Sequence, residues 1–128
     1  MTTRPERLKR LVKLQQQIKS LHELRHATHL AGAAAAGREA EELLVSLNSA
    51  SPLPGLFSDL YNRRIGAAMG RQAREVARAE TEAANVAQAT ARSNVVERSY
   101  RDATRLAERT QEEKDALESV ERGLTTLK

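Results

Sequence analysis

The sequence predicts an all-α protein: a long antiparallel two-helix coiled-coil hairpin whose second helix overhangs the first. Two of the three prolines, Pro52 and Pro54, lie together near the middle of the chain, where they oppose a helix running through. On both sides, apolar residues recur at steps of three and four, the spacing of an amphipathic helix. The composition, 40% apolar but only 2% aromatic and 30% charged, is typical of long, thin helices.

The first helix is expected over residues 4–48. Thr3 can cap it, with Glu6 three residues later and Pro5 tolerated in the first turn. Apolar residues then follow at helical spacing, which predicts the face that packs in the hairpin. They are Leu8, Leu11, Leu14, Ile18, Leu21 and Leu24.

A turn is expected over residues 49–55 and the second helix over 56–127, so that the whole chain is a single hairpin. Folding back at residue 52 gives facing residues whose numbers add to about 104. The small residues 31–36 then face 68–73, which predicts a close approach that includes Gly66 and Gly70. The leucine face of the first helix is expected opposite Ala83, Val86, Thr90 and Ser93.

The first helix ends its pairing opposite about residue 100, so residues 101–128 have no partner in their own chain. This overhang nevertheless carries apolar residues at helical spacing, which implies contact with another surface. They are Ala103, Leu106, Thr110, Leu117, Val120, Leu124 and Leu127. Arg98, Arg101, Arg105 and Arg109 line one face beside it, and the far end is acidic.

All three histidines, His22, His26 and His29, lie at spacings of four and three on one helix. Such spacing can hold zinc or nickel. No carboxylate or cysteine stands at a suitable offset on the same helix, so a polar helix flank is the preferred interpretation. No metal and no cofactor are expected.

The sequence argues against an enzyme, because it contains no phosphate-binding glycine loop, no zinc-protease motif and no serine or cysteine beside a base. The chain has no cysteine, and its first residues are charged without an apolar segment behind them, so a cytoplasmic location without a secretion signal is expected. The net charge of +4 comes from mixed signs, which argues against nucleic acid as the partner.

The run Arg7-Leu8-Lys9-Arg10-Leu11-Val12-Lys13-Leu14-Gln15 and the stretch Val96-Glu97-Arg98-Ser99-Tyr100-Arg101-Asp102-Ala103 resemble the FliJ/YscO family of type III export stalk proteins. The cluster Leu56-Phe57-Ser58-Asp59-Leu60-Tyr61 is similar in kind to that family's tip. The resemblance implies a non-catalytic coiled coil that docks with its open end in the ring of the export ATPase, contacts the export gate with its tip, and binds export chaperones. It would reach the inner face of the membrane through these partners.

Carried onto this sequence, the resemblance assigns two sets of partner-binding residues. The ATPase end would be Arg7, Lys9, Arg10 and Lys13 together with Arg98, Arg101, Arg105 and Arg109. The gate end would be Leu56, Phe57, Leu60 and Tyr61. The alternative class is a self-associating amphipathic adaptor or a phasin-like surface-coat protein, whose apolar faces would cover an apolar surface.

Overall fold

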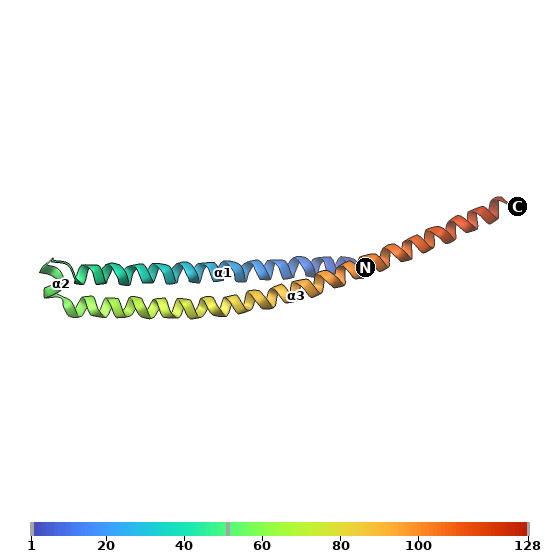
Figure 1. Ribbon diagram of the computed structural model, residues 1–128. Coiled ribbons are helices and arrows are strands. Elements are labelled where there is room, and N and C mark those ends of the chain that lie inside the picture. The colour runs from blue at the N-terminus through green and yellow to red at the C-terminus, as the bar shows by residue number, and fades with distance from the viewer. Residues whose placement is uncertain (1, 51, 128) are drawn as a thin grey trace. The chain divides into compact units, whose positions relative to one another are not determined.

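The computed structural model describes residues 2–50 and 52–127, which form three helices: α1 (Arg4–Leu47), α2 (Pro52–Leu56) and α3 (Ser58–Thr126). No strand occurs in these two stretches, and the long helices α1 and α3 pack against each other (Figure 1). The predicted all-α helical hairpin is therefore confirmed. The chain divides into two compact units: Lys19–Gln88, and α1 up to Ile18 with α3 from Ala89.

Helix α1 begins with the predicted capping interaction. The Glu6 amide donates to the Thr3 hydroxyl at 3.3 Å, and the Thr3 amide donates to the Glu6 carboxylate at 3.1 Å. Two backbone donors that have no partner within the helix are thereby satisfied. Thr3 and Glu6 thus set the start of the helix.

The predicted turn over residues 49–55 contains the short helix α2, which begins at Pro52 and ends at Leu56, while residue 51 lies outside the described residues. Both prolines lie in its first turn, where the helix needs no backbone N–H donors, so their ring nitrogens cost nothing there. Pro54 is buried, and the Phe57 amide closes the turn by donating to the Leu53 carbonyl at 3.0 Å.

In the unit Lys19–Gln88, the buried side chains between the two helices are mostly small. Ala33, Ala36 and Ala40 of α1 are buried, as are Ile65 and Ala68 of α3, and Ala68 is fully covered. Alanine at these positions lets the two backbones approach closely, as the small residues predicted. The approach is close enough that a Cβ on Gly37 would lie 2.8 Å from the Gln72 side-chain nitrogen.

The prediction that Gly66 and Gly70 take part in the close approach of the two helices is wrong. A Cβ on Gly66 would meet nothing within 4 Å, and one on Gly70 would meet only Arg74 of its own helix. The glycines that face the other helix are Gly32 and Gly37 of α1, opposite Glu75 and Gln72.

The packed face of α1 also differs from the prediction. Leu11, Leu14, Leu21 and Leu24 are exposed at 38, 50, 44 and 65%. The covered positions recur at steps of three and four in a neighbouring phase, and we call them, with their counterparts on α3, the seam. On α1 they are Pro5, Leu8, Val12, Gln15, Lys19, His22, His26, His29, Ala33, Ala36, Ala40, Leu43 and Leu47.

The counterparts on α3 keep the same heptad spacing. They are Tyr61, Ile65, Ala68, Gln72, Glu75, Ala79, Glu82, Val86, Ala89, Ser93, Val96, Tyr100 and Ala103. Ala83, which was expected to face the leucines, is exposed, whereas Val86, Thr90 and Ser93 are covered. The seam includes both the buried alanines and the histidines that contact glutamates of α3. If α1 were rotated so that its leucines faced α3, the histidines would no longer face these glutamates, and the leucines therefore stay outside.

Candidate functional site

The middle of the seam is polar, in the unit Lys19–Gln88. His22 Nδ1 lies 2.7 Å from a Glu82 carboxylate oxygen, and His29 Nδ1 lies 2.7 Å from a Glu75 oxygen. Each pair joins α1 to α3, and the residue numbers of both pairs add to 104. The predicted antiparallel register is therefore confirmed at two places.

These contacts stabilise the ionised form of both glutamates. An ionised carboxylate only accepts hydrogen bonds, so the imidazole Nδ1 must carry the donated proton. The hydrogen bond from His29 lowers the pKa of Glu75 below its ordinary value, and the hydrogen bond from His22 does the same for the pKa of Glu82. Arg78 adds a second contact to Glu75 at 2.8 Å.

Sequence reasoning missed Glu75 and Glu82, because carboxylate partners were sought on the histidines' own helix. The signal was present in the predicted register, which places residues 82 and 75 opposite residues 22 and 29. His26 is also in the seam, level with Ala79, so the three histidines face the packed side of α1 rather than a flank. The stretches 2–50 and 52–127 hold no group of three or more histidine, cysteine, aspartate or glutamate side chains placed to bind a metal ion.

The second candidate site is the end of α3, which we call the tail (residues 105–127). Every residue of the tail is exposed, and this includes its large apolar side chains. Leu106, Leu117, Val120 and Leu124 are 60, 64, 59 and 61% exposed. In the unit that contains it, the covered seam on α3 ends at Ala103 and Thr104, near the start of α1, and Figure 1 shows α3 continuing beyond that start.

The basic residues assigned to the ATPase end are exposed at the same end of this unit. Arg98 lies two residues after Val96 and two before Tyr100, so it is about 200° around the helix from both seam positions. Arg98, Arg101, Arg105 and Arg109 thus occupy the face of α3 opposite the seam. Arg7, Lys9, Arg10 and Lys13 are exposed on α1.

The four residues assigned to the gate end differ in their exposure. Leu56, Phe57 and Leu60 are 75, 52 and 46% exposed. Tyr61 instead takes a half-buried seam position, level with Leu43. Its ring therefore belongs in part to the packing between the helices.

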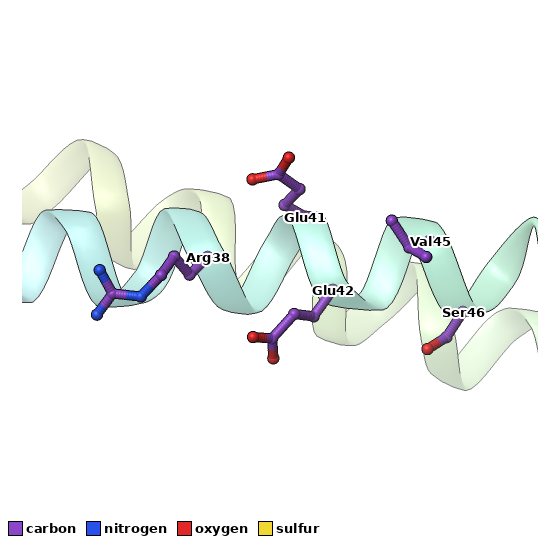
Figure 2. A pocket seen from close by; sticks show the side chains of 5 residues that line it. All are labelled: Arg38, Glu41, Glu42, Val45 and Ser46. Atoms are coloured by element: carbon purple, nitrogen blue, oxygen red, sulfur yellow. The ribbon is translucent and has the colours of Figure 1, made fainter.

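The surface hollows of the described residues are open, and some are lined by one helix and others by both. One of the latter lies between Pro5 at the start of α1 and Leu106 of the tail. Figure 2 shows one that is lined by Arg38, Glu41, Glu42, Val45 and Ser46, all from α1. The Glu41 and Glu42 side chains extend to different sides of the helix, and Arg38 points away from both. Such an arrangement does not converge charged groups on one point, as acid–base chemistry requires.

None of the described helices is long and apolar enough to cross a membrane. Compared with protein-family models, curated proteins and solved structures, the chain has no significant match.

Proposed function

We propose that this chain is a non-catalytic docking protein whose open end, formed by the start of α1 and the tail of α3, binds a protein partner. The observation that carries the proposal is the tail. It presents large apolar side chains at helical spacing. Leu106 borders a hollow beside the start of α1, whereas Leu117, Val120 and Leu124 stay about three-fifths exposed among the described residues. An isolated helix of this length is marginal in water, so burial against a partner supplies stability that the tail otherwise lacks.

We further propose, from the resemblance of the sequence to the FliJ/YscO family, that the partner is the ATPase ring of a type III or flagellar export apparatus. The eight basic residues of the open end suit an acidic ring, because opposite charges speed association and select the partner. Leu56, Phe57 and Leu60 are exposed and available for the export gate or for chaperones.

The test is a binding measurement with the purified export ATPase of the same cell, using the full chain. Replacing Arg98, Arg101, Arg105 and Arg109 by glutamate should weaken binding by two orders of magnitude or more, with a steep dependence on salt. The control replaces four exposed arginines elsewhere on α3 by glutamate, which changes the net charge equally. They are Arg63, Arg64, Arg74 and Arg92.

Equal loss of binding in both variants would show that only net charge matters. Absence of any complex with the wild-type chain would reject the export ATPase as the partner. Circular dichroism of each variant shows whether the hairpin has remained folded.

One observation favours the second candidate, a self-associating adaptor or surface coat. Leu11, Leu14 and Leu21 are exposed on α1, so the chain presents a second apolar face that the hairpin does not use. A surface coat predicts adsorption of the free chain to apolar particles, and loss of adsorption when these leucines are replaced by asparagine.

A further inference from the structure

Two surfaces of the unit formed by α1 up to Ile18 and α3 from Ala89 complement each other. The basic leucine face is the exposed Leu11 and Leu14 and the half-buried Ile18 of α1, preceded on the same face by Arg7. The tail presents Leu117, Val120 and Leu124, preceded by Glu113. Leu11 and Leu14 are 38 and 50% exposed, and the three apolar tail residues are about three-fifths exposed.

The spacing of the two surfaces is identical. Each has a charged residue, then apolar residues at steps of four, three and four, which is the repeat of a coiled-coil interface. Aligned in parallel, the two runs match each apolar residue with an apolar residue and the arginine with the glutamate. The facing pairs are Arg7 with Glu113, Leu11 with Leu117, Leu14 with Val120, and Ile18 with Leu124.

The charges favour this direction over the antiparallel one. An antiparallel alignment has the same apolar spacing but sets Glu113 against Ile18 and Arg7 against Leu124, leaving both charges without partners. With Glu113 and Arg7 included, residues 112–121 carry five acidic residues and one lysine, whereas residues 7–13 carry four basic residues and no acidic one. Parallel alignment places these two segments side by side.

The tail cannot reach the basic leucine face of its own chain. Helix α3 runs without interruption to Thr126, and residues 105–122 contain neither glycine nor proline. A reversal of direction would need a break in this helix. The face that the tail covers must therefore belong to another molecule, and a second copy of this chain carries it.

We infer that two copies of this chain associate reciprocally, with the tail of each lying parallel to the basic leucine face on α1 of the other. A two-fold axis makes the two α3 helices antiparallel, and α1 is antiparallel to α3 in the hairpin, so the tail runs parallel to the partner's α1. In this register Leu117 lies beside Leu11 of the second copy, and within a hairpin Leu11 is level with about residue 93 of α3. The two-fold axis therefore passes close to residue 105, the midpoint of 117 and 93. The tail thus begins where its own α1 stops covering α3, and the two do not compete for one face.

The inference does not rest on the proposed function, because its test uses the free chain alone. Sedimentation velocity over a dilution series should show a dimer that dissociates at low concentration. Replacing Leu117 and Leu124 by asparagine should raise the dissociation constant at least about tenfold. The control, Leu44→Asn with Val45→Asn on exposed positions of α1, should leave the constant unchanged.

A charge exchange makes the test specific for the pairing. Arg7→Glu and Glu113→Arg should each weaken the dimer several-fold, and the double variant should restore it. A chain that stays monomeric at several hundred micromolar overturns the inference and assigns the tail to a different protein. The inference is also overturned if the variant with Leu117→Asn and Leu124→Asn still forms the dimer. It is overturned as well if the variant with Arg7→Glu and Glu113→Arg does not regain the wild-type dissociation constant. Circular dichroism and thermal unfolding confirm that each variant is folded.

Discussion

Helix α3 has one sequence period along its length but two kinds of surface. From Tyr61 to Ala103 its seam positions are covered by α1, and several are small or polar: Ala68, Ala79 and Ala89 are buried, and Glu75 and Glu82 bond to histidines. In the tail, the equivalent spacing carries leucine and valine, and all of them are exposed. Three of the four leucines of α3 thus lie in the tail, where no other described segment buries them, and this contrast is the reason for proposing the tail as a docking surface.

The largest expected effect sharpens the contrast between covered and uncovered positions. Ala68→Leu inserts three carbon atoms where the side chain is fully buried, and it should destabilise the hairpin by about 1–3 kcal/mol. Ala67→Leu, at the exposed neighbouring position, should change stability by less than about 0.5 kcal/mol. Chemical denaturation followed by circular dichroism gives both values. Equal effects at the two positions would mean that Ala68 does not face α1.

A smaller effect of opposite sign is expected at Gly66. Alanine there should stabilise the hairpin by about 1 kcal/mol, since glycine is a poor helix former and the added Cβ meets nothing within 4 Å. Gly37→Ala should gain less, because the Gln72 amide nitrogen lies 2.8 Å from the new Cβ and must move. Thermal unfolding of the two variants compares them directly. A larger gain at Gly37 than at Gly66 would contradict the close approach of the helices at Gln72.

The smallest effect concerns the polar seam. The pKa values of Glu75 and Glu82 are lowered in the folded chain by hydrogen bonds from His29 and His22. Their stabilising contribution is therefore fully present above the unfolded carboxyl value near 4.5, and it is lost as the pH falls through the lower folded values.

The corresponding variant replaces both glutamates by glutamine. It should lose less stability than the wild type as the pH falls below about 4.5, because it has no carboxylate to protonate at these positions. Thermal midpoints between pH 3 and 7 show the difference. If the thermal midpoints of the two proteins fell by the same amount at low pH, the His–Glu pairs would not contribute to the stability of the hairpin.

The sequence allowed the fold class, the start of α1 and the register to be predicted. Pro52 and Pro54 locate the connection, and a hairpin folded there brings residues 22 and 82 together without further information. The packed face of α1 could not be chosen in this way. Leu11 and Leu14 belong to one series of residues with steps of three and four, and Leu8 and Val12 belong to another. Periodicity alone therefore permits both phases, and hydrophobicity favours the wrong one.

The candidate site was only partly predictable for a related reason. Exposure of the tail follows from the unequal lengths of the two helices, which the proline positions reveal. The place of Tyr61 in the seam, and of the histidines opposite glutamates, depends on which face of each helix is turned inward. That choice depends on the packing of buried alanines such as Ala36 and Ala68 between the helices, and on the pairing of charged groups across them. The residue pattern of one helix alone reveals neither of these contacts.

Hydrogen–deuterium exchange of the full chain, at a concentration low enough to keep it monomeric, tests the central claim most directly. Amides of residues 61–100 should be protected by the pairing with α1, whereas those of residues 106–127 should exchange at least about tenfold faster. Raising the concentration into the dimer range should slow exchange in residues 106–127 and in residues 7–18 together. Equal protection of residues 61–100 and 106–127 in the monomer would contradict the account, because the tail would then be covered by its own chain.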